Sequence, residues 1–114
     1  MASRFRGLAA YRLSAELSDE LHLIVSGWDH FNRDSLGRQL IRAIDSVGAN
    51  IAESAGRWHW NEKRQFLVFA RGSLYEAEHW TARAAGRRLL APDLVERFDE
   101  PARALNGLLR KPGV

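Results

Sequence analysis

Apolar residues recur at helical spacing along almost the whole chain, and this periodicity constrains the fold more than any other feature of the sequence. Such steps of three or four residues keep side chains on one face of an α-helix. No run of four or more residues alternates between apolar and polar types as a half-buried strand does. The chain is therefore predicted to be all-α. Across residues 8–28 the apolar stripe comprises Leu13, Leu17, Leu21, Ile24 and Trp28.

Four helical segments are expected, at approximately residues 8–28, 34–55, 61–89 and 92–110. Gly56 is a stop signal after the second segment, Asn61 can cap the third, and Pro92 suits the first turn of the fourth. Short links between helices favour antiparallel neighbours. We expect one domain, residues 1–114, folded as an antiparallel up-and-down four-helix bundle.

Three positions predict local features of these helices. Gly37 and Gly48 lie inside the second segment. Each glycine costs about 1 kcal/mol there relative to alanine, so the pair indicates close approach by a neighbouring helix. Pro101 interrupts the fourth segment, because proline lacks an N–H group and clashes with the preceding turn. The apolar periodicity continues across Pro101, which favours a kink over a break and restart.

The third segment carries more apolar surface than one bundle core requires. At about 100° per residue its apolar arc spans about 160°, whereas a single core needs about 100°. The extra width predicts a second apolar partner, so a homo-oligomer is the expected state. The predicted central line is Phe66, Ala70, Ser73, Ala77, Trp80 and Ala84, flanked by Phe69 on one side and by Leu67 and Leu74 on the other.

Composition narrows the class of protein. The chain has 114 residues, 46% hydrophobic and 27% charged, which suits one globular domain and excludes a disordered chain. Cysteine is missing, which excludes a disulfide scaffold, a thiolate metal site and a cysteine nucleophile, and agrees with a reducing cytoplasm. The apolar runs are too short to cross a bilayer, and the first residues lack the apolar region of a signal peptide. A soluble cytoplasmic protein without a membrane partner is expected.

A metal site is the most tempting catalytic hypothesis. Asp19 with His22, and Glu76 with His79, have the spacing of ligands in di-iron bundles, and glutamates of the other helices could complete such a set. Helical geometry places the first pair on the solvent side and the second on a flank. The sequence also lacks a nucleophile elbow, a phosphate-binding glycine loop and the Arg–His spacing of HEPN ribonucleases. We therefore predict no enzyme activity, no metal and no cofactor.

The basic residues are concentrated on one part of the chain. The formal net charge is only +3, but Arg57 and the third segment together carry more basic than acidic residues. Arginine and lysine on one surface bind phosphates, so RNA or DNA is a candidate partner. The candidate nucleic-acid-binding residues are Arg57, Lys63, Arg64, Arg71, Arg83, Arg87 and Arg88.

Aromatic residues adjoin the first of these cations, in the order Trp58, His59 and Trp60. Aromatic rings beside basic groups can stack on exposed bases. The same tryptophans could instead pack against the helices and hold the link in place, or be buried at an interface, as tryptophan commonly is. Both interpretations are consistent with the sequence.

Two stretches resemble the signatures of a known family. They are residues 39–57, QLIRAIDSVGANIAESAGR, and residues 66–78, FLVFARGSLYEAE. Both are similar to motifs of the four-helix-bundle proteins first noticed in intervening sequences of bacterial 23S ribosomal RNA genes. Ser54 stands where that family usually has glycine. The resemblance implies a left-handed up-and-down bundle that assembles as a homopentamer, without known enzymatic activity and with a poorly defined role.

A related accessory protein of diversity-generating retroelements is a similar basic pentamer that binds nucleic acid and a reverse transcriptase. The resemblance therefore implies RNA or DNA binding, and the alternative is a ring that binds a partner protein without nucleic acid. Polar motif residues beside an apolar stripe can hydrogen-bond between helices or between subunits. The residues assigned to such a structural or interface role are Asn50, Glu53, Gly56, Trp58, Trp60, Ser73 and Glu76.

Overall fold

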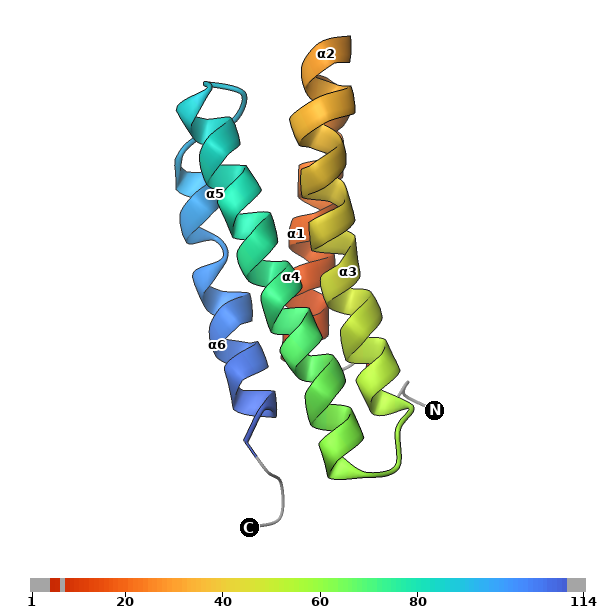
Figure 1. Cartoon of the computed structure of the whole chain (residues 1–114). Coiled ribbons are helices and arrows are strands. Elements are labelled where there is room, and N and C mark those ends of the chain that lie inside the picture. The colour runs from red at the N-terminus through yellow and green to blue at the C-terminus, as the bar shows by residue number, and fades with distance from the viewer. Residues whose placement is uncertain (1–4, 7, 111–114) are drawn as a thin grey trace.

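The computed structural model describes residues 5–6 and 8–110, and every regular element in them is helical. Figure 1 shows the elements as four rods packed side by side, which confirms the all-α, four-helix prediction. Both junctions within the second rod keep right-handed helical dihedrals, so its three elements run on without a turn. The elements in chain order are α1 (Ala9–Ser26), α2 (His30–Asn32), the π-helix η1 (Arg33–Gly37), α3 (Arg38–Ala55), α4 (Trp60–Gly86), α5 (Asp93–Glu96) and α6 (Asp99–Leu108).

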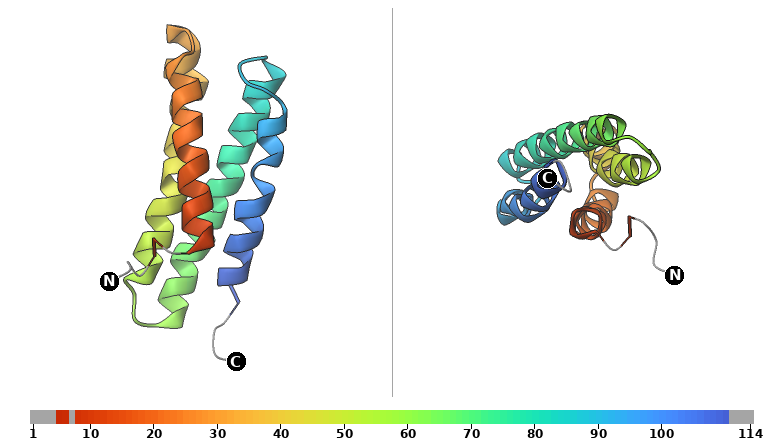
Figure 2. Two further views of the ribbon diagram at one scale, coloured as in Figure 1. Left: turned by 180° about the vertical axis from the view of Figure 1, so that it is seen from behind. Right: turned by 90° about the horizontal axis from the view of Figure 1, so that it is seen from below.

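Each rod contacts two neighbours, and the end view in Figure 2 shows the four rods around a common axis. α3 packs on α1 and most extensively on α4, while α6 closes the bundle between α4 and α1. The molecule is elongated, with principal extents of 47 × 23 × 23 Å. Consecutive rods run in opposite directions, as the short links predict.

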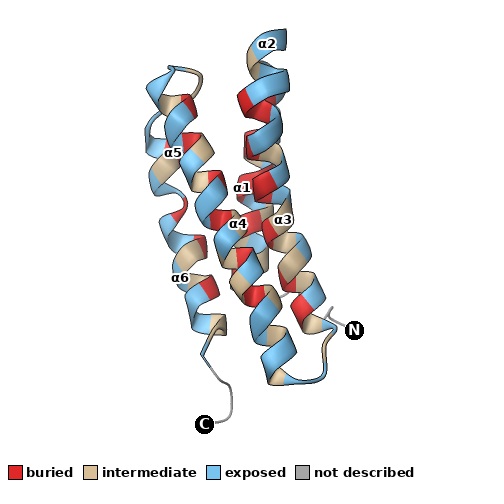
Figure 3. Ribbon diagram, viewed as in Figure 1, coloured by how far each residue is buried: buried red, intermediate tan, exposed pale blue. Residues whose placement is uncertain are grey.

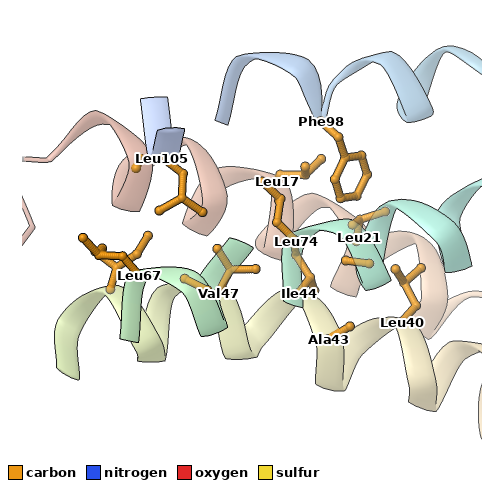
Figure 4. Close-up of a cluster of buried hydrophobic side chains, with 14 of the residues drawn as sticks. Leu17, Leu21, Leu40, Ala43, Ile44, Val47, Leu67, Leu74, Phe98 and Leu105 are labelled. Atoms are coloured by element: carbon orange, nitrogen blue, oxygen red, sulfur yellow. The ribbon is translucent and has the colours of Figure 1, made fainter. Parts of the chain in front are cut away.

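The core lies along the bundle axis, where one face of each long helix is buried (Figure 3). Figure 4 shows leucines of α1, α3 and α4 meeting Phe98. Burying a side chain of this size contributes about 1.5–3 kcal/mol, so this layer supplies much of the stability. Its largest fully buried members are Phe98, Leu17, Leu21, Leu40, Ile44, Ile51, Leu74 and Leu105.

The buried line of α4 differs from the predicted one by a rotation of the helix. The expected central residues Phe66, Ser73 and Trp80 are only half-buried, and each lies next to a buried residue in the sequence. Aliphatic side chains such as Leu67 and Leu74 fill the space between the helices, whereas the aromatic rings remain at the edge facing α3. The buried line is Leu67, Ala70, Leu74, Ala77, Thr81 and Ala84.

The second rod begins at His30, four residues before the predicted start at residue 34. Asp29 is the N-cap: its Oδ2 accepts from the backbone N–H of Asn32 at 3.3 Å, and its Oδ1 accepts from the Asn32 side chain at 2.7 Å. These two hydrogen bonds stabilise the carboxylate and hold the pKa of Asp29 below its usual range. Ser35, near the predicted start, donates its hydroxyl to the carbonyl of Phe31 at 2.7 Å.

The fourth rod breaks and restarts, so the predicted kink at Pro101 is wrong. α5 ends at Glu96 and α6 begins at Asp99, which places Pro101 in the first turn of α6. The N–H group that proline lacks would have no intrahelical partner in that turn, so the residue is tolerated there. The break itself lies at Arg97 and Phe98, whose ring is fully buried.

Both interior glycines make the close approach that their positions predict. A Cβ atom on Gly37 would lie 2.7 Å from Cγ1 of Val25, and one on Gly48 would lie 3.3 Å from Cε1 of Tyr11. Both neighbours belong to α1, so the two glycines let α1 side chains pack against the second rod. None of the described helices is both long and apolar enough to cross a membrane.

Candidate nucleic-acid interface

The candidate basic residues gather at the two ends of α4 and do not form one stripe. α4 has 27 residues, which makes it about 40 Å long. Arg57 lies in the α3–α4 link and Lys63 and Arg64 in the first turns of α4, whereas Arg83 lies in its last turn, about 30 Å away, and is followed by Arg87 and Arg88. Arg71 lies between these ends, and its Nη1 is 3.5 Å from Oδ1 of Asn106 on α6.

The C-terminal end of α4 presents Arg83, Arg87 and Arg88, all exposed. None of the three forms an ion pair with a carboxylate among the residues that the structure describes. Cations are also favoured at a helix C-terminus, where they complement the helix dipole. These guanidinium groups therefore retain their donors for an external anion. We call Arg83, Arg87 and Arg88 the C-terminal arginine cluster.

The turn after α4 holds one of these arginines in an uncommon conformation. Arg88 has φ 60°, in the left-handed region that glycine usually occupies at a helix end. The N–H of Arg88 donates to the carbonyl of Ala85 at 3.0 Å, and the N–H of Leu89 donates to that of Ala84 at 2.9 Å. This is the Schellman hydrogen-bond pattern, and a non-glycine residue in it costs about 1–2 kcal/mol. The two hydrogen bonds hold Arg88 in this conformation despite the steric cost.

At the other end of α4 the cations have partners within the chain. Arg57 donates from Nη2 to Oε1 of Glu53 at 2.6 Å, and its Cζ lies 4.7 Å from the ring centroid of Phe66. Lys63 reaches back to the carbonyl of Ser54, with Nζ and O 3.4 Å apart. Ser54 lies in the last turn of α3, whose carbonyls have no intrahelical partner. Gly56, the predicted stop signal, is the C-cap of α3.

The two tryptophans of the link differ in environment. Trp60 is the first residue of α4 and packs against the hydrophobic core cluster. Trp58 is 92% exposed. Beside Trp58 an open hollow of about 540 Å³ is lined by Ala55, Gly56, Arg57, Trp58 and Lys63.

Polar residues of the two family-like stretches meet along the seam between α3 and α4. The hydroxyls of Ser46 and Ser73 are 2.8 Å apart, which joins the two helices. The Asn50 side chain donates to the carbonyl of Ser46 at 2.9 Å and to its hydroxyl at 3.0 Å. On α4, Oε2 of Glu76 accepts from Nε1 of Trp80 at 3.1 Å. Ser46 is not among the residues predicted from the sequence, although its position one turn before Asn50 is a usable signal.

Aromatic surface remains beside this seam. The rings of Phe66 and Phe69 pack edge to face, with centroids 5.8 Å apart, and Phe69 is 49% exposed. Half-exposed Phe69 is therefore apolar surface of α4 that the chain itself covers only in part.

The acidic and histidine residues of the metal hypothesis do not assemble. Within the described residues no three His, Asp or Glu side chains come together in a group that could hold a metal ion. His22 contacts Asp45 of α3, with Nε2 and Oδ2 3.1 Å apart. Asp45 also accepts from the hydroxyl of Ser18 at 2.6 Å. This cluster therefore links α1 to α3.

Taken together, a helical bundle, a polar seam between α3 and α4 and cations at both ends of α4 define a class of small basic four-helix proteins. The sequence model of the 23S rRNA-intervening sequence protein family matches residues 6–111. The chain belongs to this family. No individual protein matches it in a comparison with curated proteins.

Proposed function

We propose that this protein is a non-enzymatic homo-oligomer, a pentamer by family resemblance, that binds RNA or single-stranded DNA through basic surface at the ends of α4. The observation that carries the proposal is the C-terminal arginine cluster, Arg83, Arg87 and Arg88. All three side chains are exposed, and none is neutralised by a carboxylate of the described chain. Each of these three exposed guanidinium groups can donate two hydrogen bonds to a phosphate, so a phosphate backbone is a suitable ligand for the cluster.

Self-assembly strengthens this surface. Phe66 and Phe69 offer apolar area beside the seam, and a second copy of the chain would bury it. A pentamer would carry a formal charge of +15, five times +3. Copies of the arginine cluster around a ring would bind one strand at several points, and multivalent contact raises affinity without new contacts in each copy.

The experiment compares two triple variants with the same change in charge. The test variant is R83A/R87A/R88A, and the matched control is R12A/R38A/R103A, which removes three exposed arginines from α1, α3 and α6. Affinity for a fluorescent single-stranded RNA is measured by anisotropy over a range of salt concentrations. The test variant should bind weakly, with a salt slope reduced by about 2 per binding protomer, because each contacted phosphate contributes about 0.7 to the slope.

The control variant should retain most of the affinity. Equal losses in the two variants would mean that only net charge matters and that the arginine cluster is not the site. Binding that does not respond to salt would exclude phosphate contact at either end of α4.

A second candidate function is a structural ring that binds a partner protein without nucleic acid. Leu23 of α1 and Phe31 of α2 support it, because both are 76% exposed and both lie at the end of the bundle where the first two rods meet. Exposed apolar side chains of this size are common at protein interfaces. Purification of the protein from nuclease-treated native cells distinguishes the two candidate functions. A single protein that co-purifies in stoichiometric amount with the wild type, and is lost with the Leu23→Ser variant, supports the protein-binding ring.

A further inference from the structure

Trp58 is held outward by the structure of the link between α3 and α4. The N–H groups of Gly56 and Arg57 donate to the carbonyls of Glu53 and Ser54 at 3.1 and 3.2 Å, which ties the start of the link to α3. The carbonyl of His59 accepts from the first turn of α4 at 3.0–3.1 Å, which ties its end. Between these anchors the Trp58 indole is 92% exposed, although Trp60 two residues later packs on the core. The link therefore exposes one aromatic ring to solvent on a backbone that is hydrogen-bonded at both ends.

Two cations lie beside this ring and line the same hollow of about 540 Å³. Arg57 contacts Glu53 through Nη2, so the N–H groups on Nε and Nη1 are available to another acceptor. The guanidinium group also packs over the Phe66 ring. Lys63 makes one long contact of 3.4 Å to Ser54 and has further donors. No side chain caps the N-terminus of α4, so its first N–H groups add positive potential beside the hollow.

We propose that this link is a base-stacking site for single-stranded nucleic acid, in which Trp58 stacks on an unpaired base while Arg57 and Lys63 hold the adjoining phosphates. The proposal rests on the nucleic-acid binding inferred above and adds a second contact at the opposite end of α4. An aromatic ring beside cations matches the alternation of base and phosphate in a single strand, whereas bases in a duplex are already stacked.

The surroundings of the ring favour this occupant over a protein or a lipid surface. The residues that flank Trp58 in the sequence, Arg57 and His59, are polar, and the hollow beside the ring is lined by the cations Arg57 and Lys63 as well as by Ala55 and Gly56. Of the described carboxylates close to the link in sequence, Glu53 and Glu62, the first is already paired with Arg57. Charge complementarity therefore selects an anionic ligand with a flat apolar group.

The experiment measures binding of the full-length protein to a fluorescent oligouridylate and to the same strand with abasic sugars. Trp58→Ala should weaken binding to oligouridylate by about 5- to 150-fold, the equivalent of about 1–3 kcal/mol for one stacked base. Trp58→Phe should restore much of the affinity, because phenylalanine also stacks. The abasic strand should bind the wild-type protein and Trp58→Ala equally, and Phe31→Ala, which removes an exposed ring at the other end of the bundle, should bind like the wild type.

The outcomes separate this site from the proposed function. Wild-type affinity in Trp58→Ala, with loss in R83A/R87A/R88A, would overturn the stacking site and leave nucleic-acid binding standing. Failure of the wild-type protein to bind any single strand would overturn both. Equal weakening of Trp58→Ala on the normal and abasic strands, or a lower oligomeric mass of this variant by light scattering, would assign the indole to another role and overturn the stacking site.

Discussion

The indole Nε1 of Trp28 donates a 2.8 Å hydrogen bond to the backbone carbonyl of Leu89, a residue 61 positions further along the chain. This bond ties the end of the first rod to the turn after α4. Leu89 directly follows Arg88, the residue in the left-handed conformation. The bond therefore helps to hold a strained turn in place, and the turn determines where the C-terminal arginine cluster projects.

Replacing Arg88 by glycine should stabilise the protein and weaken nucleic-acid binding together. Glycine adopts φ near 60° without the steric cost that arginine has, so the free energy of unfolding should rise by about 1 kcal/mol. The loss of one guanidinium should lower affinity for single-stranded RNA. Urea denaturation and anisotropy titration measure the two effects.

Arg87→Gly is the matched control, because it removes the same charge one residue earlier, where φ is −94°. Glycine has no conformational advantage at that position and increases the freedom of the unfolded chain, so Arg87→Gly should lower stability. A gain of stability in both variants would mean that the left-handed turn is not the cause.

The Ser46–Ser73 hydrogen bond should couple α3 and α4 energetically. Ser46→Ala and Ser73→Ala should each lower the free energy of unfolding by about 1 kcal/mol, the usual net contribution of such a bond. The double variant should lose less than the sum, because the first change already removes the shared bond. Urea denaturation of the four proteins gives the coupling energy, and strictly additive losses would contradict it.

Stability should depend on pH through Asp29. The native pKa of this carboxyl lies below the ordinary value of 3.8, so its ionised form stabilises the fold above that pH. The contribution is lost as the pH falls through the lowered native pKa, where the folded carboxyl finally takes up its proton. Asp29→Asn keeps a capping oxygen and does not titrate, so its unfolding free energy should fall less than that of the wild type on acidification below about pH 4. Identical pH profiles would show that the cap does not act through its charge.

Self-association should depend on the half-exposed ring of Phe69. Phe69→Asp places a charge on the proposed interface and should lower the mass measured by light scattering toward the 12.9 kDa protomer. Tyr75→Asp is the control, since Tyr75 is 50% exposed on the same helix but about 120° around its axis. A wild-type mass of 12.9 kDa would refute the interface itself.

Much of the fold followed from helical periodicity, and its errors have physical causes. Leu17 and Leu21 are buried as predicted, because the first helix has only one apolar stripe. In α4, Phe66 and Leu67 are adjacent and both fit a helical period, so only packing between the four helices decides which faces the core. The left-handed residue after α4 was not predicted, because the nearby glycine of this turn lies two residues earlier, at Gly86.

The candidate site was predictable in composition but not in arrangement. Counting charges locates the candidate cations on and beside α4, yet the length of that helix separates them into two groups. Sequence alone could not distinguish Trp58 from Trp60, since both are tryptophans in one short link. Their difference arises because the first turn of α4 directs Trp60 toward the core.

The break in the fourth rod has a consequence for local opening. α5 has only four residues and is bounded by turns on both sides, so few of its amides belong to a continuous hydrogen-bond ladder. Between α5 and α6, Nη2 of Arg97 lies 2.7 Å from Oε2 of Glu20 on α1, and both side chains are exposed. α5 can therefore unfold locally while Phe98 and the helices around it stay packed. Amide hydrogens of α5 should exchange with solvent long before those of α3.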